Sequence, residues 1–356
     1  MKKFFLKFGL ALNLGAILLL LIAYLAAYVP PDSFWPIAFF GLAYPYFLLL
    51  NILFVAFWGI QRSKMFLIST LAIILGLTNF TNTYQLIPRL HSGGSGIKVL
   101  SFNVHGFRSD LRTSKVKSPK FVDYFKSNGS EIICLQEAIF VKGGKLSPEG
   151  LKAALPAVDF YQLASNGGNT GLITLSKFPI VNHGEIHFPG SSNLVLFTDL
   201  KVTGRQTIRV YNCHLQSYSI DPDDYSVIDD LGSSPNREQI KEAQKVSFKL
   251  IKGFKLRAAQ SRRVAEHIQK SPFPVLVCGD FNDTPLSYAY HIVRGDLKDA
   301  FVEAGWWTSN TYNGELPSFR IDYMLFDPKL RVTSYARDRV KLSDHFPIRC
   351  RLELKD

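Results

Sequence analysis

The chain has 356 residues, of which 47% are hydrophobic and 20% charged, and its formal net charge is +12 at pH 7. It has no internal repeat, no low-complexity tract and no zinc-binding spacing among its four cysteines, which argues against repeat architectures and a structural zinc site. Residues 1–96 hold six Lys or Arg and one acid, so residues 97–356 keep a net charge of +7. That excess is compatible with an anionic substrate or a membrane surface and specifies neither.

Three apolar runs, residues 4–29, 34–60 and 65–80, predict a transmembrane region of about three helices within residues 1–90. The first run is too long for the apolar core of a cleaved signal peptide. The second contains Pro36 and Pro45, which a membrane helix tolerates. The third is short and holds four polar residues, so a re-entrant or interfacial segment is an open alternative.

The positions of Lys and Arg predict how these runs are oriented. Lys2, Lys3 and Lys7 stand before or at the start of the first run, and Arg62 and Lys64 follow the second, so the N-terminus is expected inside an inner (cytoplasmic) membrane. Three crossings would place the large domain outside the cytoplasm, whereas two would leave it in the cytoplasm. Residues 91–96 predict a short flexible linker, and residues 97–356 a separate domain.

The large domain alternates short apolar runs with Ser-Pro and Gly boundaries. Ser118 and Ser147 each start a predicted helix, because each is followed by Pro at the first helical position. A long helix is expected over about 236–270. Strands are expected at 97–103, 131–137, 171–180, 193–202, 206–217, 274–280, 320–326 and 346–354. This order predicts an α/β domain with two packed sheets and helices outside.

Polar side chains stand at the ends of these predicted strands and predict one polar site at one edge of the sheets. They are Asn103, Glu137, Asn212, His214, Asp280, Asn282, Asp322, Asp344 and His345. Oxygen donors with few His or Cys favour Mg²⁺, with Mn²⁺ as an alternative. Such a set favours the hydrolysis of phosphoesters.

Seven motifs carry a resemblance that runs from about residue 98 to 354. In chain order they are "SFNVHG", "CLQE", "LITLSKFPI", "NCHLQS", "GDFNDTP", "RIDYML" and "SDHFPI". Together they resemble the endonuclease/exonuclease/phosphatase superfamily, which includes deoxyribonuclease I and the neutral sphingomyelinases. The resemblance implies a four-layer α/β/β/α sandwich, with residues 97–356 as the catalytic domain.

The resemblance also implies roles for individual residues. Asp280 would position or deprotonate the attacking water, and His345, polarised by Asp322, would contact the scissile phosphate. The number of metals and the identity of the general base are left open. The implied metal ligands are Asn103, Glu137 and Asp344; the catalytic residues are His214, Asp280, Asn282, Asp322 and His345; the substrate-binding residues are Asn212, Asn282 and His214.

Three functions are weighed. The first is a membrane-anchored, Mg²⁺-dependent hydrolase of phosphoester bonds, with a lipid head group favoured over nucleic acid and no protein partner predicted. The second is a deoxyribonuclease I-like nuclease acting on extracytoplasmic nucleic acid, and the third an inactive membrane module. His105 is interpreted as a turn residue or a neighbour of the site. The basic stretch 249–263 is either a solvated helix face or a surface for anionic lipid.

Overall fold

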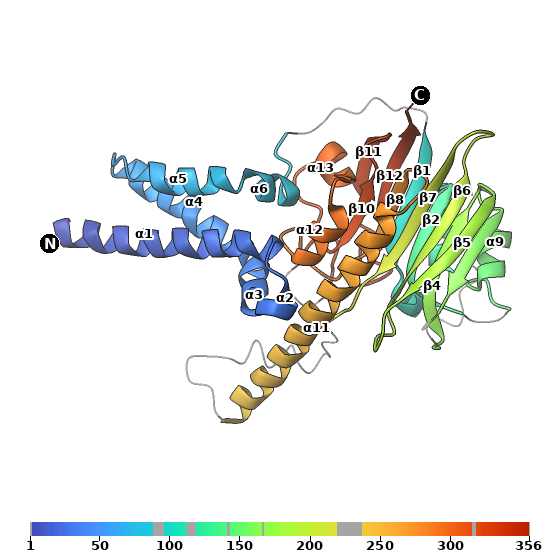
Figure 1. The fold of residues 1–356 in the computed structure, drawn as a ribbon, viewed down its shortest axis with the longest axis horizontal. Coiled ribbons are helices and arrows are strands. Elements are labelled where there is room, and N and C mark those ends of the chain that lie inside the picture. Colours follow the sequence, from blue (N-terminus) through green and yellow to red (C-terminus); the bar gives the residue numbers. More distant parts are fainter. Residues whose placement is uncertain are drawn as a thin grey trace.

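The computed structural model describes residues 2–87, 96–111, 119–140, 143–165, 167–218, 237–314 and 318–355. Most of the predicted linker, 91–95, and most of the predicted polar loop before the long helix, 219–235, lie outside the described residues. Figure 1 shows two parts: helices from the N-terminal end extend to one side of a β-sandwich.

The sandwich consists of two six-stranded sheets. The first has the order β11 (Leu330–Arg337), β12 (Ile348–Leu354), β1 (Ile97–Asn103), β2 (Ile132–Ile139), β4 (Thr170–Ser176) and β3 (Phe160–Ala164). The second has the order β5 (Ile180–His187), β6 (Leu194–Lys201), β7 (Thr207–His214), β8 (Val275–Asp280), β10 (Asp322–Phe326) and β9 (Lys298–Asp299). Each sheet has one parallel pair at its centre, β1–β2 and β7–β8, so both are mixed.

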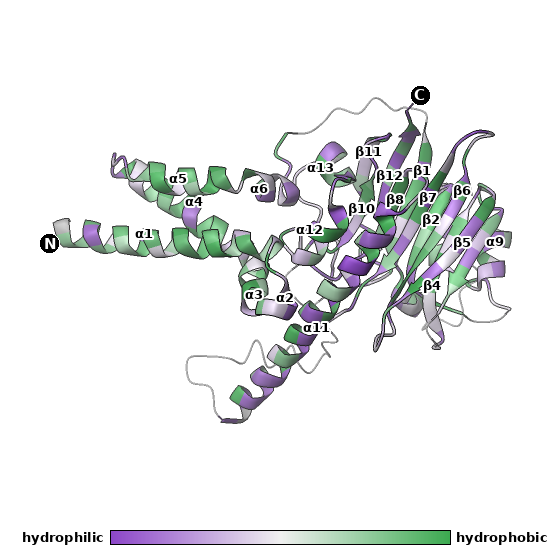
Figure 2. Cartoon of the chain, viewed as in Figure 1, coloured by the Kyte–Doolittle hydropathy of each residue, from purple (hydrophilic) through white to green (hydrophobic). Residues whose placement is uncertain are grey.

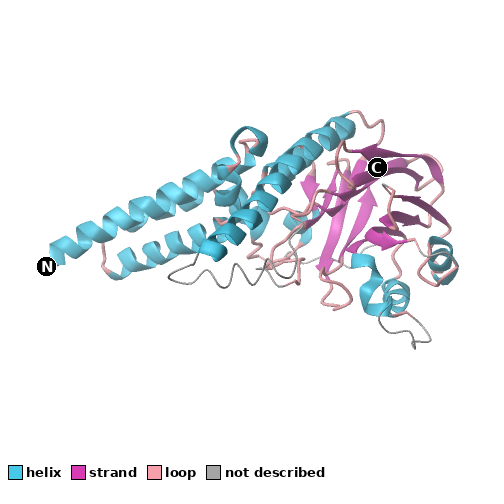
Figure 3. Cartoon of the chain, turned by 90° about the horizontal axis from the view of Figure 1, so that it is seen from below, coloured by secondary structure: helices cyan, strands magenta, loops and turns pink. Residues whose placement is uncertain are grey.

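Helices cover the outer face of each sheet, which confirms the predicted sandwich with outer helices (Figure 3). On the first sheet, α8 (Lys120–Asn128) and α9 (Pro148–Ala154) bury Phe121 and Leu151. On the second, α11 (Arg237–Gln269) and α12 (Tyr288–Arg294) bury Val264 and Tyr290. Between the sheets lies a separate apolar core that includes Val99, Cys134, Val210, Cys278 and Met324. The central strands are therefore buried on both faces, which explains their near-continuous apolar sequences.

Gly279 lets the two parallel strands of the second sheet approach closely just before their polar ends. Its φ is +142°, and a Cβ there would lie 2.0 Å from the carbonyl oxygen of Cys213 on β7. Only glycine fits such a contact without moving the backbone. The side chains of His214 and Asp280, which follow on the two strands, are thus brought side by side.

The N-terminal part contains one helix long and apolar enough to cross a membrane, Phe4–Ala27, which includes most of α1 (Lys2–Tyr24). Two bent pairs pass the same test together, so the described residues hold up to three spans. The pairs are α3 (Pro36–Leu42) with α4 (Tyr44–Ile60), bent by 60°, and α5 (Phe66–Leu75) with α6 (Leu77–Thr83), bent by 69°. Figure 2 shows that most residues of α3, α4 and α5 are hydrophobic, whereas α6 is largely polar.

Two residues account for the bends, which the continuous apolar runs did not predict. Pro45 stands in the first turn of α4, and a proline disfavours helical geometry in the residue before it. At the second bend, a Cβ on Gly76 would lie 2.0 Å from the ring of Tyr24. The chain therefore turns where α1 packs against the junction of α5 and α6.

Buried polar side chains join α1, α4 and α5 to one another. Asn13 Nδ2 donates to Ser69 Oγ over 2.6 Å, and Trp58 Nε1 donates to Asn13 Oδ1 over 2.9 Å. Asn51 Nδ2 donates to the carbonyl oxygen of Ala16 over 2.9 Å. Large apolar side chains such as Leu18 and Leu53 are exposed instead. Polar groups inside and apolar groups outside are typical of helices packed in a lipid environment.

The helical part contacts the sandwich through α6 and through the short helix that contains Asp32. Arg262 of α11 forms an ion pair with Asp32 in α2 (Pro31–Phe34). The carbonyl oxygen of Asn82 in α6 accepts from Arg320 Nη2 over 2.6 Å, and its Oδ1 accepts from Arg294 Nη1 over 2.7 Å. Leu286, just after the predicted site motif "GDFNDTP", belongs to the apolar cluster of the helices.

Candidate active site

Five strands of the two sheets bring predicted site residues to one edge of the sandwich. Asn103 ends β1, His214 ends β7 and Asp280 ends β8, while Glu137 lies near the end of β2. Asp322 begins β10, which runs antiparallel to β8, and it pairs directly with Asp280. Strand direction and register alone therefore gather residues that are up to 219 positions apart.

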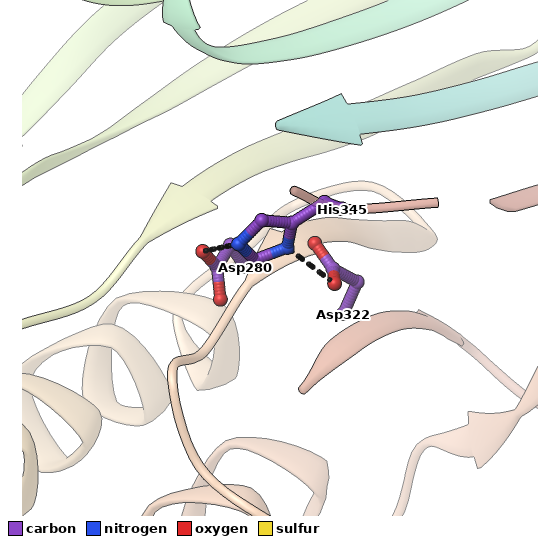
Figure 4. Close-up of side chains that lie close together, drawn as sticks. All are labelled: Asp280, Asp322 and His345. Carbon is purple, nitrogen blue, oxygen red and sulfur yellow. Dashed lines mark hydrogen bonds and ion pairs between the residues drawn. The ribbon is translucent and has the colours of Figure 1, made fainter. Parts of the chain in front are cut away.

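At the centre of this edge lies a buried Asp–His–Asp chain, shown in Figure 4. His345 Nδ1 lies 2.9 Å from Asp322 Oδ2, and its Nε2 lies 3.7 Å from Asp280 Oδ2. All three residues are at most 5% exposed. His345 stands in the loop before β12, where it bridges to Tyr312 and its ring meets the Tyr312 ring edge-on.

Electrostatics favour a protonated His345. Burial by itself would lower its pKa, but the charges of Asp322 and Asp280 and the hydrogen bond to Asp322 outweigh burial and raise the pKa to about 10. Burial raises the pKa of Asp280, and nearby Asp322 acts in the same direction, while the imidazolium of His345 opposes both. Asp280 is therefore a more basic carboxylate than an ordinary aspartate.

Glu137 lies beside this chain and is held by Asn103. Asn103 Nδ2 donates to Glu137 Oε1 and to Asp280 Oδ2, each over 3.0 Å. Burial would raise the pKa of Glu137, but His214, the Asn103 amide and more distant histidines together lower it. Its carboxylate is thus ionised at neutral pH. His214 Nε2 lies 3.5 Å from Glu137 Oε1, and this buried nitrogen has no hydrogen-bond partner among the described residues.

Asp344 precedes His345 in the chain and contacts His105. Its Oδ1 lies 2.9 Å from His105 Nδ1 and 3.1 Å from Ser343 Oγ. Ser343 Oγ also donates to the carbonyl oxygen of Asn103 over 2.8 Å. Burial alone would raise the pKa of Asp344, but His105 and His345 lower it. The sequence predicts that His105 is either a turn residue or a neighbour of the site, and the structure shows it in contact with Asp344. Its position two residues after Asn103 was the only sequence signal.

Asn282 is fastened to the site by its own backbone and side chain. Its N–H donates to Asp280 Oδ1 over 2.8 Å, and its Nδ2 donates to the carbonyl oxygen of Leu215 over 3.0 Å. Asn282, Glu137 and His105 have φ values of 54°, 53° and 44°. Positive φ is costly for residues other than glycine, and its concentration here indicates a backbone shaped by the site.

Asn212 is not at this edge, contrary to its prediction as a substrate-binding residue. It is fully buried between the sheets, where its Nδ2 donates to the carbonyl oxygen of Ile173 over 3.0 Å and its Oδ1 accepts from Gln136 Nε2 over 2.7 Å. Because strand residues alternate in direction, Asn212 points to the inner face of β7 while its neighbour Cys213 points outward. Asn212 joins the two sheets.

Two groups of donors could hold a divalent cation. Asp280, Asp322 and His345 offer ligand atoms within 4.8 Å of one another. The carboxylate oxygens of Asp280 and Asp322 already contact the His345 ring, and the positive charge of that ring would repel a cation. The predicted set differs: Glu137 and Asp344 are ionised, their side chains are 35% and 33% exposed, and Asn103 supports Glu137. Partly exposed carboxylates that leave room for water suit Mg²⁺, so the predicted set fits a hard divalent ion.

Comparisons with known proteins agree with this architecture. Residues 100–345 match the sequence model of the endonuclease/exonuclease/phosphatase family, and residues 2–83 match that of a domain of unknown function (DUF8431). No curated protein matches the chain. Among solved structures, an endonuclease/exonuclease/phosphatase from Beutenbergia cavernae is similar, with 17% identity, a TM-score of 0.52 and coverage of 74% of this chain and 72% of that one.

A second similar structure is humanized D. rerio TDP2, with 17% identity, a TM-score of 0.50 and coverage of 73% of this chain and all of the other. At these identities the likeness concerns the fold. It spans the sandwich and agrees with the two packed sheets described above.

Proposed function

We propose that this chain, which belongs to the endonuclease/exonuclease/phosphatase family, is a membrane-anchored, metal-dependent hydrolase of a phosphoester in a lipid head group. Hydrolysis of phosphoester bonds is the activity of the family. The observation that carries the proposal is the buried Asp322–His345–Asp280 chain beside the ionised Glu137. These are the acid, base and anionic groups that phosphoester hydrolysis needs at one place.

In this proposal Asp280 orients and deprotonates the attacking water, because its raised pKa makes it a better base than an ordinary aspartate. His345 is cationic and stabilises charge that develops on the phosphoryl oxygens. Asp322 fixes the orientation of the His345 ring through Nδ1. His214 Nε2, which lies 3.5 Å from Glu137 Oε1 and makes no hydrogen bond among the described residues, would donate to a phosphoryl or leaving oxygen.

Glu137 and Asp344, with Asn103 in support, would hold the metal. A bound Mg²⁺ would neutralise charge on the phosphate and lower the energy of the transition state. Asn282 keeps Asp280 in place through its backbone N–H. Removal of divalent ions with EDTA should therefore abolish hydrolysis, and added Mg²⁺ should restore it; hydrolysis at an unchanged rate in EDTA would contradict the metal requirement.

The position of the site supports a substrate at the bilayer. Asp280 is six residues from Leu286, which packs in the helical cluster, so the two backbones are at most about 20 Å apart. Asp322 is two residues from Arg320, which hydrogen-bonds Asn82 of α6. The edge that carries the predicted catalytic residues is thus connected directly to the helices proposed as the membrane anchor.

The test is a substrate panel on the full chain in detergent micelles with Mg²⁺. It contains sphingomyelin, phosphatidyl lipids, inositol phosphates, RNA and duplex DNA, with the Asp280→Asn variant as the blank. Hydrolysis of a lipid that the blank does not perform supports the proposal. Activity confined to nucleic acid would instead establish the nuclease alternative, and no activity on any phosphoester would overturn both.

A further inference from the structure

The first half of α11, residues 237–255, extends from the sandwich toward the side of the N-terminal helices. Figures 1 and 3 show this from two directions, with the start of α11 reaching back to the level of α2 and α3. A helix of 33 residues is about 50 Å long, so α11 can lie on the sheet at one end and reach the base of the anchor at the other.

Within α11 the buried and exposed faces are sharply separated. Val246, Phe254, Arg257, Ser261 and Val264 are buried, and they recur at helical spacing on the side that faces the sandwich. Contacts with the helical part adjoin this side: the Phe254 ring lies 5.2 Å from the ring of Phe39 in α3. The remaining side of the first half is mostly exposed, and at its end Lys255 lies close enough to Asp32 of α2 to help lower the pKa of that carboxyl.

The exposed charged side chains that the structure describes on that side of residues 241–255 are all positive. Lys241, Lys245, Lys252 and Lys255 are all exposed and follow one another at spacings of four, seven and three, which places them along a single stripe. The single carboxylate among residues 241–263 is Glu242, which is partly buried. Among the described residues, none of the four lysines forms an ion pair with an acidic group. An ordinary solvated helix face would mix both signs.

Two apolar side chains are exposed beside the lysines. Phe248 is 69% exposed and Ile240 is 44% exposed. They are eight residues apart and so project from similar sides of the helix. Exposed Phe and Ile flanked by lysines are typical of helices that lie in the interface of an anionic membrane. At the far end of the stripe, Arg262 is paired with Asp32 at the base of the helical part.

We propose that this face of α11, defined by Ile240, Lys241, Lys245, Phe248, Lys252 and Lys255, binds the head groups of anionic phospholipids. The bound helix forms a second contact with the bilayer and holds the sandwich at a fixed tilt above it. The proposal rests on the membrane anchoring put forward above and is independent of the reaction catalysed. Charge complementarity selects an anionic surface over a neutral one.

The test places a fluorescent label on the stripe of the full chain in bilayer discs. Gln244→Cys supplies the labelling site, because Gln244 is exposed on this side and the four native cysteines are buried. Quenching by a nitroxide-bearing lipid is expected in discs of phosphatidylcholine with phosphatidylglycerol. It should be weak in phosphatidylcholine alone and should decrease as salt is added.

Charge reversal provides the decisive comparison. Glutamate at positions 241, 245, 252 and 255 should remove most of the quenching. The same reversal at four exposed lysines elsewhere, Lys120, Lys126, Lys152 and Lys201, should leave it unchanged; the first three lie on α8 and α9, on the opposite outer layer. Equal loss in both variants would overturn the proposal, because the effect would then reflect net charge alone.

The remaining outcomes also discriminate. A chain that enters the bilayer with an unquenched label overturns this proposal and leaves the proposed hydrolase intact. A chain that does not enter a bilayer overturns the anchor and this proposal together. If quenching appears only after the five aspartates of residues 221–230 are changed to asparagine, that segment occupies the stripe and the lipid proposal is wrong.

Discussion

Asp322 controls the charge of His345, because it forms the shorter of the two contacts to the ring. In Asp322→Asn the amide keeps the shape but removes one of the charges that raise the pKa of His345. The pKa should therefore fall from about 10 toward that of an ordinary histidine. NMR titration of ¹⁵N-labelled imidazoles in EDTA measures this shift.

The matched control for this variant is Asp327→Asn. Asp327 follows β10 at the end opposite to Asp322, where its Oδ1 accepts from the N–H of Lys329. This variant should leave the pKa of His345 unchanged. An unshifted His345 in Asp322→Asn would contradict the charge pairing inferred here.

Asn212 should behave as a structural residue. Asn212→Leu would remove the 2.7 Å hydrogen bond of Gln136 Nε2, which keeps only two contacts of 3.3 Å, and would remove a donor to the carbonyl oxygen of Ile173 between the sheets. We expect the free energy of unfolding to fall by about 2–4 kcal/mol, since each buried polar group left unpaired costs about 1–3 kcal/mol. Thermal unfolding measures the loss. Normal stability with an increased KM would instead restore Asn212 to the substrate site.

At the scale of elements, the approach of β7 and β8 depends on one position. A methyl group at residue 279 would overlap the backbone of Cys213, so Gly279→Ala should prevent normal folding or separate His214 from Asp280. Gly204→Ala is the control, because nothing lies within 4 Å of its added Cβ and it needs no positive φ. Protein yield and thermal unfolding should fall for the first variant alone. Equal behaviour of the two would show that the strands can move apart at little cost.

The sequence predicted eight of the twelve strands among the described residues, and their polar ends, because both depend on local pattern: apolar runs, Ser-Pro helix starts and a change to polar residues. It did not predict β3, β5, β9 and β11. The two packed sheets were predicted from the order of the predicted strands and helices, and the structure confirms them. The bends of the N-terminal helices were not predicted, since Gly76 turns against Tyr24, a contact across 52 residues. Asn212 was misplaced for a related reason: it shares a face of β7 with His214, but it lies two residues farther from the end of the strand, where the opposite sheet covers it. The place of His105 in the site could not be predicted from local pattern, because it depends on a contact with Asp344, which is far along the chain.

At the scale of the whole molecule, the number of crossings decides where the sandwich lies. A reporter fused after Asp356 should behave as extracytoplasmic if α1 and both bent pairs cross, given an N-terminus inside. A cytoplasmic signal would mean that one of the bent pairs enters and leaves on the same side. The control is a fusion after Lys64, where the loop between the second and third runs should be cytoplasmic.

The hydrogen bond between Arg320 and Asn82 has a consequence for how the chain unfolds. Arg320 is buried, and its other partner is Asp299, so part of the interior of the sandwich is completed by a carbonyl oxygen of α6. Leu286 likewise completes the apolar cluster of the helices from the side of the sandwich. Each part therefore needs a residue of the other to complete its buried interior. Heat or denaturant should therefore melt the two parts in one cooperative transition, and a sandwich severed from its helices should lose stability at the end of β10 that bears Asp322.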